Sequence, residues 1–293
     1  MNNKVRKAVI PVAGYGTRFL PFTKAVPKPM LPILNKPALQ VITEEVVKSG
    51  ITDVLFIVGY KKEILESHFK PAEELEKMLE SKGKLNFLEE VRYPTSMANI
   101  SYIIQEEQNG TASAVGLAKE FVGNEPFAVL FGDDVMYNEG RPVIGQLIDV
   151  YEKYGKTVLG CKRVSMDDIS KYASVEYSSV LEDGVYAMTK VTEKPKKEEA
   201  KSDIAPLGRY VCSPDIFDII ENLGKGANGE YQFTDALDAQ ARQGKALAYT
   251  FKGTRYDMGD RLGYLKANIE YGLRDESLKD QFKEYLKDLV NKI

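Results

Sequence analysis

The chain has 293 residues, 43% of them hydrophobic, and a formal net charge of -3 at pH 7. This length allows one large domain with an ample core. The balance of charge argues against general nucleic-acid binding, and no stretch approaches the ~20 apolar residues that span a bilayer. Cys161 and Cys212 form no metal motif. Together with the lack of a signal-peptide pattern, they favour a reduced cytoplasmic protein with no nucleic-acid or membrane partner.

The N-terminal stretch carries charge of one sign. The first 43 residues contain seven basic side chains and no acid. Within them, the apolar run 8–13 leads into Gly14-x-Gly16, and Arg18 and Lys28 follow. A buried strand that ends in a glycine turn presents backbone N–H groups able to hold an anion. The pattern suits a polyphosphate and predicts a nucleoside triphosphate as ligand, although Gly-x-Gly alone is more often a structural turn.

Strand and helix signals alternate through the first half of the chain. Apolar runs predict strands at residues 9–12, 54–58, 100–104 and 127–131. Helical spacing predicts helices at residues 37–48, 61–69, 73–82, 111–121 and 143–154. This order predicts an α/β fold with a doubly wound, mainly parallel, Rossmann-like sheet.

The second half is richer in strands. Strands are expected at residues 158–163, 174–180, 185–193, 207–212 and 246–251, and helices at 214–222 and 233–243. A C-terminal helix would place one apolar stripe along its length, made of Phe282, Tyr285, Leu286, Leu289, Val290 and Ile293. No linker or repeat divides the chain, so we predict a single domain.

Carboxylates follow a predicted strand as Gly132-Asp133-Asp134. In a parallel sheet, this strand end lies at the same edge as the Gly14 loop. Carboxylates that face phosphates suggest Mg²⁺, which takes only one or two protein carboxylates and keeps several waters. Asp257, expected after another strand, is a plausible second ligand. Each acid could instead be a turn residue or a helix cap.

A third candidate group is Glu193-Lys194-Pro195. Glu193 could accept hydrogen bonds from sugar hydroxyls and Lys194 could bind a monophosphate, or the two could be a solvated charge pair. Residues 229–235 could be only a helix N-terminus, capped by Thr234 or Asp235. The single histidine, His68, fits a structural position.

No nucleophile elbow or catalytic cysteine motif is present in the sequence. A reaction that needs neither a protein nucleophile nor a strong base therefore fits better. A phosphate monoester has a second pKa of roughly 6, so at neutral pH it is already its own nucleophile. The protein then needs only to screen charge, align the attack and stabilise the leaving group.

Taken together, these segments resemble the sugar-phosphate nucleotidylyltransferases, nearest to the bacterial UTP–glucose-1-phosphate uridylyltransferase branch. The likeness runs from Ala8 to about Arg274. It is carried by Ala13-Gly14-x-Gly16-Thr17-Arg18, Pro27-Lys28-x-Met30-Leu31-Pro32, Gly132-Asp133-Asp134, Glu193-Lys194-Pro195, Gly208-Arg209-Tyr210, Glu230-x-Gln232-x-Thr234-Asp235, Tyr256-Asp257-x-Gly259 and Leu262-Gly263-Tyr264.

The resemblance implies an enzyme that transfers UMP from UTP to glucose 1-phosphate with Mg²⁺, giving UDP-glucose and pyrophosphate. It implies a nucleotide-binding half at about 1–155, a sugar-phosphate-binding half at about 156–260 and C-terminal helices at about 261–293. A homodimer or higher homo-oligomer is also expected.

The resemblance further assigns roles to residues of this chain. Catalytic roles fall on Arg18, Lys28, Asp133 and Lys194. Nucleotide contacts fall on Ala13, Gly14, Gly16, Thr17, Arg18, Lys28, Gln105 and Gly110, where Gln105 and the backbone at Ala13, Gly14 and Gly110 would read the uracil. Sugar-phosphate contacts fall on Ala173, Glu193, Lys194 and Gly208, and the metal ligands would be Asp133 and Asp257.

Two segments depart from the family pattern. Family members usually have Gly-Leu-Gly-His-Ala where this chain has Gly110-Thr111-Ala112-Ser113-Ala114, and Tyr-Gly where it has Tyr172-Ala173. By the resemblance, the first would lie beside the base and the second near the sugar. Alternative functions are therefore a transferase for dTTP or another sugar phosphate, and a non-catalytic regulator that binds a nucleotide sugar. Retention of the metal and phosphate residues argues against the regulator.

Overall fold

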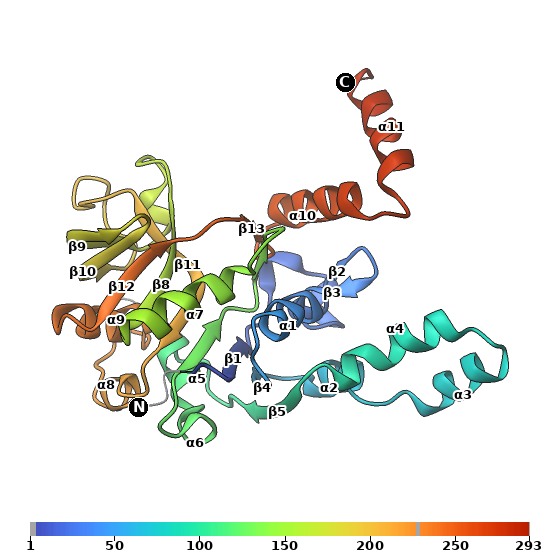
Figure 1. Ribbon diagram of the computed structural model, residues 1–293, viewed down its shortest axis with the longest axis horizontal. Helices are drawn as coiled ribbons and strands as arrows, with labels where there is room; N and C mark the ends of the chain where they lie inside the picture. Colours follow the sequence, from blue (N-terminus) through green and yellow to red (C-terminus); the bar gives the residue numbers. More distant parts are fainter. Residues whose placement is uncertain (1–3, 227–228, 293) are drawn as a thin grey trace.

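A nine-stranded sheet forms the centre of the molecule (Figure 1), in a computed structural model that describes residues 4–226 and 229–292. The strand order is β5-β4-β1-β6-β11-β8-β12-β10-β9. The strands are β1 (Lys7–Val12), β4 (Asp53–Val58), β5 (Asn99–Ile104), β6 (Phe127–Leu130), β8 (Thr157–Arg163), β9 (Ser174–Glu182), β10 (Val185–Thr192), β11 (Ile204–Cys212) and β12 (Ala246–Thr250).

The two halves of the chain contribute differently to this sheet. Strands β5, β4, β1 and β6 pair in parallel, as the alternation of strands and helices predicts. Among the later strands, β12 pairs with β8 in parallel, while β11 joins β6 and β8 antiparallel and β10 joins β12 and β9 antiparallel. The predicted fold class, α/β with a β-rich second half, is confirmed.

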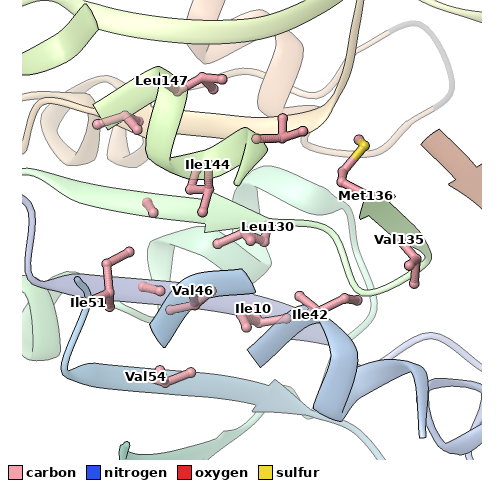
Figure 2. Close-up of a cluster of buried hydrophobic side chains, with 14 of the residues drawn as sticks. Ile10, Ile42, Val46, Ile51, Val54, Leu130, Val135, Met136, Ile144 and Leu147 are labelled. Carbon is pink, nitrogen blue, oxygen red and sulfur yellow. The ribbon is translucent and has the colours of Figure 1, made fainter. Parts of the chain in front are cut away.

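Helices cover both faces of the sheet because residues along its strands alternate between two buried clusters. Ala8 and Ile10 of β1 pack on one face, whereas Val9 packs on the other. The first face is covered by α1 (Ala38–Lys48) and α7 (Val143–Tyr154), whose Ile42, Val46, Ile144 and Leu147 lie over Ile10 and Leu130 in Figure 2. The second is covered by α5 (Thr111–Gly116), α8 (Ile216–Glu221) and α9 (Phe233–Arg242).

The remaining helices contribute fewer residues to the two clusters, among them Leu65 and Phe69 of the first cluster and Val122 of the second. They are α2 (Lys62–Phe69), α3 (Glu73–Ser81), α4 (Leu85–Ser96), α6 (Lys119–Val122), α10 (Arg261–Arg274) and α11 (Lys279–Val290). The helix expected at 111–121 is wrong as one element, because the chain breaks into α5 and α6 beyond Gly116, a poor helix former. Helix α4, which contains Pro94 and has little buried surface, lacks a clear sequence signal and was not predicted.

Two short antiparallel ribbons and four 3-10 turns complete the secondary structure of residues 4–226 and 229–292. The ribbons pair β2 (Pro32–Ile33) with β3 (Lys36–Pro37), and β7 (Asp134–Tyr137) with β13 (Thr254–Asp257). The turns are η1 (Thr17–Phe19), η2 (Phe22–Lys24), η3 (Lys28–Met30) and η4 (Ile169–Lys171). In the second ribbon, Asp257 pairs directly with Asp134, so two segments distant in sequence bring their acids together.

The C-terminal helices extend beyond the sheet, and α11 stands away from the rest of the molecule (Figure 1). The predicted helix is present, but no residue within Lys279–Val290 is buried. Its stripe includes Tyr285, 59% exposed, and Val290, 67% exposed. Ile293, the last member of the predicted stripe, lies outside the described residues. None of the helices in the described ranges has the length and hydropathy to cross a membrane.

Candidate active site

A cavity of about 630 Å³ opens at the carboxyl edge of the parallel strands. It collects most of the residues that the sequence singles out: Ala13, Gly14, Gly16, Thr17, Arg18, Lys28, Gln105, Gly110, Asp133, Glu193 and Lys194 all line it. Ala173, Gly208 and Asp257 are not among its lining residues. The cavity therefore joins the expected triphosphate loop to the expected sugar-phosphate group.

The glycine loop is held tightly against the segment that carries Lys28. Gly16 adopts φ +65°, and a Cβ added there would lie 2.8 Å from Cβ of Lys28. The buried Thr23 hydroxyl donates to the carbonyl of Gly16 at 2.9 Å, and the Tyr60 hydroxyl donates to the carbonyl of Thr23 at 3.1 Å. Only glycine fits this backbone position, and the close packing fixes where the Lys28 side chain begins.

Charged groups from three segments converge around Gly259. A Cβ added at Gly259 would lie 2.6 Å from Asp257 Oδ1. The same point lies 3.3 Å from Arg18 Nη1 and 3.3 Å from Lys28 Nζ. The absence of a side chain at Gly259 therefore leaves space that two cations and one carboxylate share at the cavity wall.

The side chain of Asp133 forms an ion pair with Lys28, and its main-chain carbonyl accepts a hydrogen bond. Lys28 Nζ lies 3.0 Å from Asp133 Oδ2, and Met258 N donates to the Asp133 carbonyl at 2.7 Å. Burial alone would raise the pKa of the Asp133 carboxyl, but the charge and hydrogen bond of Lys28, together with a backbone hydrogen bond and the charge of Arg255, hold that pKa below its ordinary value. The carboxylate is thus ionised at neutral pH.

Arg255, which the sequence reasoning missed, joins two carboxylates behind the cavity. Its Nε donates to Asp134 Oδ1 at 2.5 Å, and its Nη2 donates to Asp257 Oδ2 at 3.2 Å. The other oxygen of Asp257 accepts from Gly259 N at 2.7 Å. Burial, together with the charge of Asp133, raises the pKa of Asp134 to about 6 although Arg255 opposes the shift. Asp257 is consequently held in one orientation beside the cavity.

Arg209 forms a second, fully buried anchor. Its guanidinium donates to both oxygens of Glu45, and its Nη2 donates to the Asp134 carbonyl at 2.7 Å. Glu45 also accepts from Ile144 N at 2.9 Å. The network ties α1, α7 and β11 to the turn that bears Asp133. The Gly208-Arg209-Tyr210 motif was the sequence signal for this anchor, but nothing local pointed to Glu45.

The part of the cavity that the sequence assigned to the sugar phosphate is built around Glu193 and Lys194. Glu193 Oε2 accepts from the Thr234 hydroxyl at 2.7 Å, so Thr234 is not the helix cap that its position suggested. Lys194 has φ +41°, its N–H donates to the Tyr172 carbonyl at 3.0 Å, and its side chain is 61% exposed. Ala173 instead lies in the hydrophobic cluster on that face of the sheet, 7% exposed. Its methyl group is therefore directed into the core.

The part of the cavity that the sequence assigned to the base contains the side-chain amide of Gln105. Gln105 is buried, its N–H donates to the Val58 carbonyl at 2.8 Å, and within the described ranges its side-chain amide has no protein partner. Gln108, a residue that sequence reasoning missed, donates from Nε2 to the Ala13 carbonyl at 2.7 Å. Glu230 and Gln232 also line the cavity and belong to a motif noted in the sequence without a clear role.

Comparison with known proteins gives the class of the chain. The nucleotidyl transferase family profile matches residues 7–272. The chain therefore belongs to the nucleotidyl transferase family. Within it, the chain is 46% identical to UTP–glucose-1-phosphate uridylyltransferase of Staphylococcus epidermidis strain RP62A, over 98% of this chain and 99% of that one. It is also 46% identical to UTP–glucose-1-phosphate uridylyltransferase 2 of Staphylococcus saprophyticus, over 98% of each chain.

Solved structures give the same result. A UDP-glucose pyrophosphorylase complexed with UDP-glucose superposes with a TM-score of 0.85 at 37% identity, over 93% of this chain and 100% of that chain. The UTP-bound enzyme from Acinetobacter baumannii superposes with a TM-score of 0.91 at 32% identity, over 98% and 100%. The resemblance noted from the sequence motifs is thereby confirmed.

Proposed function

We propose that the chain transfers UMP from UTP to glucose 1-phosphate, producing UDP-glucose and pyrophosphate. The observation that carries this proposal is the single cavity that joins Arg18 and Lys28 to Glu193 and Lys194. One cavity can thus hold a triphosphate and a sugar phosphate together. The full-length similarity to uridylyltransferases supports the same substrates.

The reaction needs no protein nucleophile. A phosphate oxygen of glucose 1-phosphate attacks the α-phosphorus of UTP, and a new P–O bond forms as the bond between the α-phosphorus and its bridging oxygen breaks. The bonding electrons leave on pyrophosphate. Lys194 positions the attacking phosphate, and Arg18 and Lys28 stabilise the negative charge that grows on the transferred and leaving groups. In-line alignment and screening of charge supply the catalysis.

Asp133 and Asp257 fit a divalent metal, for which we propose Mg²⁺. Their oxygens are hard donors, and Asp133 is kept ionised by Lys28. No cluster of three or more His, Cys, Asp or Glu within residues 4–226 and 229–292 suits a metal. A pair of carboxylates is sufficient, because Mg²⁺ usually takes one or two carboxylates together with substrate phosphates and water. When bound, the metal would neutralise charge on the α-phosphate.

We propose the remaining contacts with the base, the phosphates and the sugar from where the residues lie relative to the cavity. The free amide of Gln105 and the backbone at Ala13, Gly14 and Gly110 would read the uracil, and Gly16 and Thr17 would contact the phosphates; all of them line the cavity. Glu193 is placed to accept from glucose hydroxyls. Ala173 and Gly208 do not line the cavity, so contacts of these two residues with the sugar stay a prediction.

The test is pyrophosphate release with UTP, dTTP and CTP, each paired with glucose 1-phosphate. We expect release with UTP, and we expect Asp133→Asn to lower turnover by orders of magnitude while the fold is retained. Asp149→Asn, which removes an exposed carboxylate paired with Arg141, is the matched control. Pyrophosphate release with dTTP alone would show that the chain is a thymidylyltransferase. Binding of UDP-glucose without pyrophosphate release from any nucleotide would show that it is a non-catalytic regulator.

We also propose that two copies associate through α11. A helix of this length is marginal in water unless its apolar face is covered. The apolar face bears Tyr285, Leu289 and Val290, all exposed, while the helix carries three lysines and three acids, so two copies would not repel. In sedimentation equilibrium, the wild type should exceed the 32.8 kDa monomer. Leu289→Glu should shift it to monomer and Lys283→Glu should not; a wild-type monomer would refute the proposal.

We propose further that the chain acts as one catalytic domain in the cytoplasm. One sheet contains strands from residues 1–155 and 156–260, which supports a single folding unit. Cys161 and Cys212 are free and fully buried, and burial raises the pKa of both thiols. Inert, reduced cysteines suit a reducing compartment.

A further inference from the structure

Helix α9 begins with a cap that comes from another part of the chain. Gln232 occupies its N-cap position and makes no side-chain cap hydrogen bond. Instead, the N–H of Phe233, the first helical residue, donates to Oγ1 of Thr111 at 2.9 Å. Because the first N–H groups of a helix lack intrahelical partners, this hydroxyl satisfies a donor that the local sequence leaves open.

Backbone contacts join the same two segments. The N–H of Tyr231 donates to the Asn109 carbonyl at 2.9 Å, and the N–H of Ala112 donates to the Tyr231 carbonyl at 2.9 Å. Gly110 packs so closely that an added Cβ would lie 2.3 Å from the Tyr231 carbonyl oxygen. Residues 109–112, the base loop, and residues 231–234, the cap segment, are therefore fastened together.

The cap segment reaches the sugar side of the cavity at its other end. The hydroxyl of Thr234 donates to Glu193 Oε2 at 2.7 Å. Glu193 and Lys194 line the same cavity as Gly110 and Thr111. A continuous path thus runs from Thr111 through Phe233 and Thr234 to Glu193, linking the proposed base side to the proposed sugar side.

We propose that Thr111 is a positioning residue that couples UTP binding to glucose 1-phosphate binding, an inference that rests on the proposed function. A nucleotide that orders the base loop also orders the cap segment and Glu193, so the sugar phosphate meets a site already in place. Leucine, the usual residue at this position in the family, has no hydrogen-bond acceptor. The side-chain part of the coupling therefore belongs to this chain rather than to the family pattern.

The test compares Thr111→Val, which removes the acceptor and keeps the shape, with Thr111→Ser, which keeps the acceptor. Thr111→Val should raise KM for glucose 1-phosphate about fivefold, the effect of one neutral hydrogen bond, as well as raising KM for UTP. Thr111→Ser should keep both KM values at the wild-type level. A rise in KM for UTP alone would reduce Thr111 to a base contact, and a lower melting temperature with both KM values unchanged would make its role purely structural; either outcome overturns the proposal.

A double-mutant cycle with Thr234→Val tests the path itself. If Thr111 acts on the sugar side through Thr234, the double variant should raise KM for glucose 1-phosphate by less than the product of the two single effects. Independent, multiplying effects would overturn the coupling. Wild-type turnover of UTP with glucose 1-phosphate tests the proposed function separately, since that turnover can be normal whichever pattern the variants show.

Discussion

Replacing Gly208 by alanine should disturb the acids behind the cavity without touching the cavity itself. Gly208 has φ +63°, and a Cβ there would lie 2.2 Å from Asp134 Oδ2 and 3.0 Å from its Cγ. The Asp134 side chain is only 8% exposed and is bound by Arg255, so it has no free space in which to move aside. The new methyl group must therefore break the pair of Asp134 with Arg255 or distort β11.

The magnitude follows from two separable costs. An alanine in the left-handed region costs about 1–2 kcal/mol. Breaking a buried ion pair costs about 3–5 kcal/mol more. Gly244 is a matched control because it has φ +69° and nothing within 4 Å of an added Cβ, so Gly244→Ala carries only the first cost. The difference between the two variants measures the contact with Asp134 alone.

Urea unfolding and steady-state kinetics provide the assay. Gly208→Ala should lose about 3–5 kcal/mol more stability than Gly244→Ala. It should also lose turnover, because Arg255 holds Asp257 as well as Asp134. Gly244→Ala should keep wild-type turnover. Equal destabilisation and equal turnover in the two variants would show that the Asp134 pair does not position Asp257, and the account of the site would have to change.

Further predictions concern charge, base and pH. Lys28→Ala should lower kcat about 10²–10³-fold, and a change confined to KM for UTP would contradict its role in the transition state. In competition assays, CTP should be rejected more strongly than dTTP, because the Gln105 amide matches the edge shared by uracil and thymine; equal turnover of CTP and UTP would remove Gln105 from the base site. Burial lowers the pKa of His68, so unfolding binds a proton and stability should fall as pH drops below about 6.5. In His68→Gln, the urea midpoint of unfolding should depend less on pH in this range. An unchanged pH dependence would show that other groups cause the loss of stability.

Local patterns in the sequence predicted much of the fold and the residues that line the cavity. The strand before Gly14 and the strand at residues 127–131 can both be predicted, because each is an apolar run that ends in glycine, followed in the second case by two acids. Because parallel strands share one carboxyl edge, two such signals are enough to place Lys28 and Asp133 together. The ion pair of 3.0 Å between these side chains is the result.

Pairings between distant segments could not be predicted in this way. Arg255 meets Asp134 across 121 positions, and Arg209 meets Glu45 across 164. No periodicity or local motif predicts which arginine will pair with which acid, since the pairing depends on where β13 and β11 lie in the folded chain. The apolar stripe predicted on the C-terminal helix is present on α11, but its exposure could not be predicted, because an amphipathic pattern shows that a face is apolar, not what covers it.

This division follows the chemistry of the site. Side chains proposed to touch phosphates, such as Lys28 and Asp133, lie on short segments whose backbone must approach the ligand, and this need constrains the local sequence. Side chains that hold the neighbouring segments in place need only reach them from elsewhere in the fold. Arg255 reaches Asp134 and Asp257 in this way, and Thr111 reaches Phe233. Substitutions at holding positions can therefore alter how two substrates influence each other while the residues that act on phosphate stay the same. Thr111 is such a position, where one hydroxyl caps α9 and ties the base loop to the cap segment that contacts Glu193.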